Sequence, residues 1–177
     1  MRNITKVFVG LVLLGLMAAP TVQAEDTFIQ LSILDPIQLF PNDYDVQGIR
    51  LNILYGNNTN VSGVDLGLVN KVTGDLHGVQ LGVVNLVDGH VRGLQSGYVN
   101  VVQGDFIGWQ HGYVNITRGD FAGLQTGFFY NTADHMQGLQ IALCNHAGNL
   151  DGLQIGLLNF NDNRDPLGFF PIVNFSF

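Results

Sequence analysis

A repeat of fifteen residues restricts the fold of this chain more than any other feature. Glycines occur at 48, 63, 78, 93, 108, 123 and 138, each fifteen residues after the last, and then at 152. The residues after each glycine also match, as in GVQLGVVN (78–85), GLQSGYVN (93–100), GWQHGYVN (108–115) and GLQIGLLN (152–159). A fixed period of this kind predicts one small structural unit built many times over, with each copy packing on its neighbours.

The units are predicted to be β-strands joined by short turns. Runs of about eleven residues are rich in Val, Leu, Phe and Tyr, contain no proline, and hold too many glycines and β-branched residues for helices. They span 75–85, 90–100, 105–115, 120–130, 135–145 and 149–159, with further strands expected at 26–34, 46–55, 61–70 and 167–177. Turns such as 71–74 and 86–89 end in glycine, as in a type I turn with a glycine bulge. The chain is therefore predicted to be all-β.

Alternation gives each run two faces. In 75–85, one face carries Leu76, Gly78, Gln80 and Gly82, and the other face is mostly apolar at its centre. If each repeat forms one strand, about ten tilted strands would form an up-and-down antiparallel barrel of the outer-membrane type. The terminal phenylalanine, Phe177, supports that fold, since it resembles the last strand of Gram-negative outer-membrane barrels. The lumen of such a barrel would be lined by a glutamine from each of six repeats: Gln80, Gln95, Gln110, Gln125, Gln140 and Gln154.

The same period also fits a parallel β-solenoid with one fifteen-residue rung per repeat. Stacking would then place those six glutamines in one hydrogen-bonded ladder. A second ladder would consist of asparagines: Asn70, Asn85, Asn100, Asn115, Asn145 and Asn159. A water-soluble barrel with its apolar face inward is a third arrangement. The barrel in the membrane is the preferred prediction, and the solenoid is the alternative.

Residues 1–24 are predicted to be a secretory signal peptide, leaving one repetitive domain over 25–177 with its repeats at about 48–160. Arg2 and Lys6 form a positive start, an apolar stretch follows, and Val22-Gln23-Ala24 is a typical cleavage site. No run of apolar residues reaches the ~18 of a spanning helix. The prediction is therefore export to the outer membrane or cell surface, with the periplasm as the alternative.

Composition narrows the possible functions. Seven basic residues against fourteen acidic ones give a net charge of −7, so nucleic acid is not an expected partner. One cysteine, Cys144, excludes a disulfide framework. It occupies a column held elsewhere by Val, Phe or Leu, and is interpreted as a small apolar side chain. The histidines, with no metal-binding spacing between them, are expected at rims and turns: His77, His90, His111, His135 and His146. Neither enzymatic activity, nor a catalytic residue, nor a metal or other cofactor is expected.

The repeated unit G-[LV]-Q-x-G-x-x-N and the ending PIVNFSF (171–177) resemble uncharacterised, exported surface-repeat proteins of Gram-negative bacteria. The resemblance covers about 46–177 and implies an envelope location without an established activity or site residues. This copy departs from the unit at Asn52, Tyr55, Tyr130 and Ala142. We expect a structural barrel or narrow pore for small solutes, with membrane lipid and the barrel-assembly machinery as partners. The alternative is a surface solenoid that acts as a binding or adhesion module. The sequence leaves the oligomeric state open.

Overall fold

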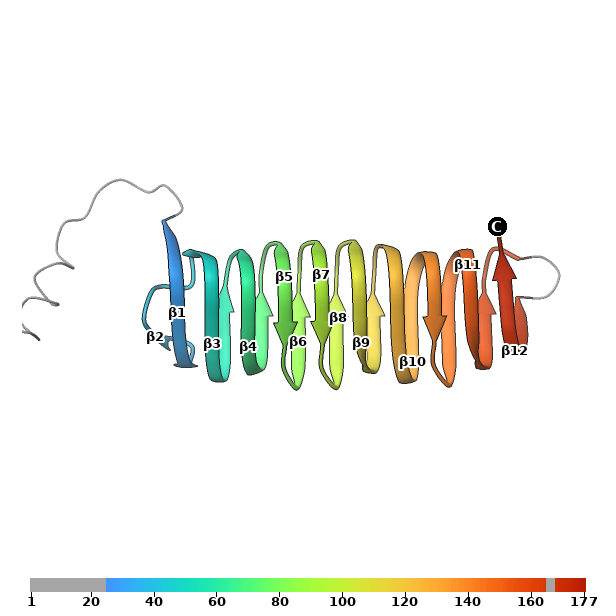
Figure 1. Cartoon of the computed structure of the whole chain (residues 1–177), viewed down its shortest axis with the longest axis horizontal. Helices are drawn as coiled ribbons and strands as arrows, with labels where there is room; N and C mark the ends of the chain where they lie inside the picture. Colours follow the sequence, from blue (N-terminus) through green and yellow to red (C-terminus); the bar gives the residue numbers. More distant parts are fainter. Residues whose placement is uncertain (1–24, 165–167) are drawn as a thin grey trace, which may run out of the picture.

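The computed structural model describes residues 25–164 and 168–177, which form strands stacked along one axis (Figure 1). The predicted signal peptide lies outside these ranges, and so does residue 167 of the predicted closing strand. The strands are β1 (Asp26–Leu34), β2 (Ile37–Gln38), β3 (Asp45–Asn58), β4 (Val61–Val72), β5 (Leu76–Leu81), β6 (Val84–Val87), β7 (Val91–Ser96), β8 (Val99–Val102), β9 (Phe106–Thr117), β10 (Asp120–Ile141), β11 (Cys144–Asn161) and β12 (Phe169–Ser176).

The architecture is a parallel β-solenoid, so the all-β prediction is confirmed and the antiparallel barrel is wrong. From β3 to β11 each strand pairs in parallel with its counterpart one repeat further on, for example Gly63 with Gly78 and Gly78 with Gly93. The repeat is therefore one turn of the solenoid, here called a coil, and residues at the same position in successive coils form a column. Antiparallel pairs occur only at the two ends of the described sheet, between β1 and β2 and between β11 and β12.

The barrel prediction failed because the eleven-residue runs are not single straight strands. In the coil that begins at Leu76, β5 ends at Leu81 and β6 begins at Val84, so the chain turns a corner at Gly82 and Val83. Inward and outward positions change phase there, which puts Gln80 and Asn85 on the inside together, both fully buried. Strict alternation along 75–85 would have placed these two side chains on opposite faces.

Glycine is required in the column that defines the repeat. Gly78 and its equivalents have φ values between 125° and 150°, in the region that L side chains rarely adopt. A Cβ atom added to Gly108 would lie 2.0 Å from the carbonyl oxygen of Gly93, one coil earlier. This column therefore allows the backbones of successive coils to approach each other where a side chain would keep them apart.

The apolar core is two narrow columns inside the solenoid. The first begins each coil and includes Phe106 and Phe121, whose rings stack with their centroids 4.8 Å apart. All its members are buried: Val46, Val61, Leu76, Val91, Phe106, Phe121, Met136 and Leu150. The second column, near the end of each coil, contains small side chains such as Val87 and Ala147. Between the two, the interior is polar.

The turns between coils carry their own hydrogen-bonded column. The Asp75 carboxylate accepts the backbone N–H of His90 at 2.8 Å, and His90 Nδ1 accepts the N–H of Asp105 at 3.0 Å. Asp105 in turn accepts the N–H of Asp120. The Asp, Asn and His residues of this column therefore tie one coil to the next, and the glycine-containing turns are connections between coils and not hairpins.

Candidate functional site

The six glutamines that a barrel would place along a lumen lie instead inside the solenoid, each 0% exposed. From Gln95 onward, each side-chain amide donates from Nε2 to Oε1 of the glutamine one coil earlier, at 2.7 to 2.8 Å. The glutamine ladder expected for a solenoid is therefore present. Because these amides bind each other across the interior, they are structural groups and not the wall of a channel.

The glutamine ladder has a fixed direction and a distinct group at each end. At the C-terminal end, Arg164 Nη1 donates to Asn174 Oδ1 at 3.0 Å, and Asn174 Nδ2 donates to Gln154 Oε1 at 2.8 Å. At the N-terminal end, Gln80 Nε2 donates to the Asp65 carboxylate at 2.8 Å. A guanidinium can only donate and a carboxylate can only accept. One hydrogen-bond chain therefore runs from Arg164 to Asp65 with every amide donating in the same sense.

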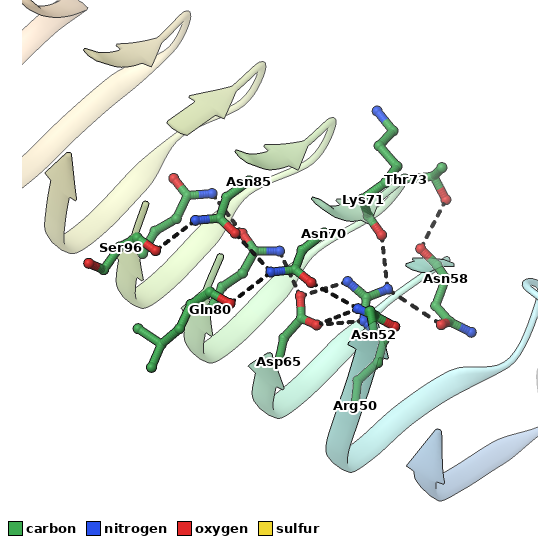
Figure 2. Close-up of polar contacts among 12 residues, drawn as sticks. Arg50, Asn52, Asn58, Asp65, Asn70, Lys71, Thr73, Gln80, Asn85 and Ser96 are labelled. Atoms are coloured by element: carbon green, nitrogen blue, oxygen red, sulfur yellow. Dashed lines mark hydrogen bonds and ion pairs between the residues drawn. The ribbon is translucent and has the colours of Figure 1, made fainter. Parts of the chain in front are cut away.

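A buried ion pair completes the N-terminal end of this chain. Arg50 and Asp65 form a two-pronged contact, with Nε to Oδ1 at 2.8 Å and Nη2 to Oδ2 at 2.6 Å, and both side chains are fully buried. Arg50 Nη1 also donates to the backbone carbonyl of Lys71 at 2.9 Å. Figure 2 shows Asp65 between Arg50 and Gln80. Arg50 and Asp65 occupy the glutamine column, and the sequence interpretation missed them because their residue types differ from the repeat.

The asparagine ladder runs beside the first and donates in the opposite direction. Asn70 Nδ2 donates to Asn85 Oδ1 at 2.9 Å (Figure 2), and the pattern continues to Asn159 at 2.8 to 3.1 Å. Asn131 belongs to this ladder although the sequence pattern pointed to Tyr130. The spacing is sixteen residues before Asn131 and fourteen after it, because that coil has one extra residue at its corner.

The departure at Asn52 also has a structural reason. In the first full coil, Gly56 occupies the asparagine column opposite Asn70, and Asn52 occupies the column that is elsewhere mainly glycine. The side chain of Asn52 fills the space that Gly56 leaves, and Asn52 Nδ2 donates to Asn70 Oδ1 at 2.9 Å. Glycine and asparagine have thus exchanged positions within this coil, and the side-chain amide of Asn52 still forms the first member of the asparagine ladder.

The histidines are spread over the surface of the solenoid and do not converge. His90 lies in the turn column, His146 Nε2 is 3.0 Å from Asp162, and His111 contacts Thr126 on the outer surface. Within residues 25–164 and 168–177, no three His, Cys, Asp or Glu side chains lie close enough to hold a metal ion. Cys144 is half-buried on the outer surface, where burial raises the pKa of its thiol above the usual value.

The most unusual surface of the molecule is an apolar strip, which we call the apolar face. It consists of three outward columns that follow the long strand of each coil and its corner. The first is Ile49, Val64, Val79, Leu94, Trp109, Leu124, Leu139 and Leu153. The second is Leu51, Leu66, Leu81, Ser96, His111, Thr126, Ile141 and Ile155. The third is Ile53, Leu68, Val83, Tyr98, Tyr113, Phe128, Leu143 and Leu157. None of these positions holds Asp, Glu, Lys or Arg, and many of the large side chains are about half exposed.

The centre of the apolar face combines aromatic rings with a few polar groups. The Tyr98 and Tyr113 rings stack with centroids 4.7 Å apart and planes within 1°, and Phe128 continues the row with its ring tilted against Tyr113. Beside them, Trp109 Nε1 donates to Thr126 Oγ1 at 2.9 Å, and His111 Nδ1 lies 2.9 Å from the same oxygen. Because the stacked rings of Tyr98 and Tyr113 cover each other's faces, their exposed surface consists mainly of ring edges.

Shallow depressions run along the apolar face between its second and third columns. One of about 370 Å³ is lined by the glycine corner Gly82, Gly97 and Gly112 together with Ser96 and Tyr98 among others. A second of about 360 Å³ lies at Leu51, Gly67 and Leu68. The row of Tyr98, Tyr113 and Phe128 therefore forms a ridge that borders a groove.

Comparison of the chain with protein-family models, with curated proteins and with solved structures finds no match. In the described part of the chain, no helix has the length and apolar character needed to span a membrane.

Proposed function

We propose that this chain is a non-enzymatic binding module of the bacterial cell envelope, exported by residues 1–24 and displayed as a rigid solenoid. The single observation that supports this role is the apolar face. Contiguous apolar surface of this extent is uncommon on soluble monomers and marks interaction sites. A parallel sheet is normally covered on both faces, and here only the inner face is covered.

The distribution of charge supports the same role. The acidic side chains lie largely at the turns, as do Asp75, Asp105 and Asp120. The carboxylates of Asp75 and Asp105 each accept a backbone N–H from the next coil, and Asp120 donates the N–H that Asp105 accepts. Charge at one edge keeps the molecule in solution, while the uncharged face is available for contact. The interior ladders hold the columns of this face in register, so the surface is preorganised and little conformational entropy is lost on binding.

Site-specific photo-crosslinking in the producing cells tests this proposal. A photoreactive amino acid is placed at Tyr98 on the apolar face or, as the matched control, at Gln103 in the exposed turn of the same coil. We expect the chain to be recovered outside the cytoplasm with its N-terminus at Glu25, and adducts to form from position 98 but not from position 103. Retention of the uncleaved chain in the cytoplasm, or equal labelling at both positions, would contradict the proposed function.

A further inference from the structure

We infer that the apolar face is covered by a second copy of this chain, packed face to face about a two-fold axis. This inference rests on the proposed function, because it names the partner of the same surface. The columns extend beyond the repeats: Ile29 of β1 pairs with Ile49, and Phe175 of β12 pairs with Leu153. The apolar face therefore continues without interruption into both terminal strands.

The size of the face suits a dimer. With strands about 4.8 Å apart and residues about 3.3 Å apart along each strand, the face is about 45 Å long and about 15 Å wide. Pairing two such faces would bury on the order of 1,300 Å², which lies within the range of stable protein interfaces. Sheets that pack in this way lie about 10 Å apart, a distance that side chains such as Leu94, Leu124 and Leu139 can fill.

The polar groups at the centre of the face can be removed from water at low cost. Trp109 and His111 both reach Thr126 Oγ1, so the indole N–H already has a partner within the chain. A buried polar group is costly mainly when it has no hydrogen-bond partner. The side chains of Tyr98 and Tyr113 are about half exposed, and tyrosine suits an interface because its ring buries apolar area while its hydroxyl can bond a partner.

The arrangement of the three columns allows the face to pair with itself. The row of Tyr98, Tyr113 and Phe128 lies at one margin of the face, beside the depression at Gly82, Gly97 and Gly112. A two-fold axis along the second column sets the third column of each copy against the first column of the other over the full width of the face, as an isologous interface requires. The acidic turns at the opposite edge of each coil then lie away from the interface, which limits repulsion between two chains of net charge −7.

A lipid surface is a less suitable partner for this face. Proteins that lie on membranes combine an apolar face with flanking Lys and Arg residues that attract anionic lipids. The column beside the apolar face consists of Ser62, His77, Arg92, Ile107, Ala122, Gln137 and Asp151. It therefore holds one Arg and no Lys. The overall negative charge of the chain would be repelled by an anionic bilayer.

The test compares the mature wild-type chain with two variants that gain the same charge. Tyr113→Lys lies at the centre of the ridge, and Gln103→Lys lies in the exposed turn. By sedimentation equilibrium, we expect the wild type and Gln103→Lys to have twice the mass of one chain. We expect Tyr113→Lys to self-associate more weakly by roughly 30-fold or more, as for an interface hot spot. Circular dichroism should give the same β-spectrum for all three chains.

The results distinguish the proposed binding role of the apolar face from the inference that its partner is a second copy of this chain. A wild-type chain that stays monomeric at high micromolar concentration, or a Tyr113→Lys variant that dimerises as well as Gln103→Lys, would overturn the second copy as partner. A further outcome is that adducts form from position 98 in cells with a mass that differs from that of two chains. In that case the binding role remains, and the partner is a different molecule. Flotation of the monomer with vesicles of zwitterionic lipid would assign the face to a bilayer.

Discussion

The two ends of the glutamine ladder solve the same problem with different groups. At the N-terminal end, the last donor meets Asp65, a fully buried carboxylate that is held by the fully buried Arg50. At the C-terminal end, the last acceptor is reached by Asn174, whose own oxygen accepts from the half-buried Arg164. The guanidinium of Arg164 also lies 4.5 Å from the centre of the Phe170 ring and donates to the carbonyl of Phe175 at 2.7 Å.

The difference shows how a row of identical amides can be ended inside a protein. Each glutamine amide in the row accepts from one neighbour and donates to the other, so only the two terminal groups lack a partner of their own kind. A group that only donates and a group that only accepts satisfy both ends. Where the end is sealed under another coil, the carboxylate needs a buried counter-charge. Where the end meets solvent, one partly exposed arginine is sufficient.

The largest expected effect follows from removing the charge of Asp65. Asp65→Asn leaves Arg50 buried with no anion, and loss of one member of a buried ion pair costs about 3 to 5 kcal/mol. Because a solenoid is stabilised by neighbouring coils in turn, we expect the loss to be concentrated in β3 and β4. Hydrogen exchange should therefore show opening of these strands first, and urea unfolding should show a lower midpoint.

Two variants make that result specific. Asp75→Asn changes a turn carboxylate whose oxygen only accepts a backbone N–H, so it should change stability by less than about 0.5 kcal/mol. Arg50→Gln combined with Asp65→Gln extends the amide ladder without charge and should stay within about 1.5 kcal/mol of the wild type, since neutral replacements of buried pairs are often tolerated. A double variant as unstable as Asp65→Asn would show that the ion pair itself is needed.

An intermediate effect is expected from breaking the ladder between its two ends. Gln110→Leu leaves Gln95 Oε1 without its donor, whereas Gln125 Nε2 keeps the carbonyl of Thr132 at 3.1 Å. An unpaired buried acceptor costs about 1 to 3 kcal/mol. Chemical denaturation measures the loss, with Gln103→Leu at the surface as the control. Unchanged stability of Gln110→Leu would mean that the ladder contributes little beyond filling space.

The smallest effect is expected at the solvent-facing end. Arg164→Gln removes the charged donor from Asn174, but Arg164 is partly exposed and the new amide can still donate to that oxygen, so we expect a loss of less than about 1 kcal/mol. Hydrogen exchange in β12 and the end of β11 measures the change. A loss as large as that of Asp65→Asn would remove the distinction between the two ends.

The sequence predicted the elements better than their arrangement. It placed β1 at 26–34 as observed, ahead of the repeats, and gave strands in each later unit. It predicted both amide ladders only for the alternative fold, the solenoid. It favoured antiparallel neighbours, which was wrong, because the alternation pattern places Gly82 and Val83 in the interior of one strand, whereas they form a corner. Arg50, Asp65 and Asn131 were missed because each interrupts the residue pattern while keeping its place inside the coil.

The sequence by itself determined that this chain is all-β and built of equivalent units, because runs rich in β-branched and aromatic residues recur at a fixed spacing. That these units stack in parallel was decided by the tertiary structure. Only the tertiary structure decided that the chain turns at the corner of each coil, and hence which side chains face inward. Inward and outward positions alternate along a strand, so a single corner reverses the side on which every later residue lies. That reversal brought Gln80 and Asn85 inside together. Trp109 and Tyr113 lie before the reversed residues of their coil, so they share the outer face that simple alternation gives them.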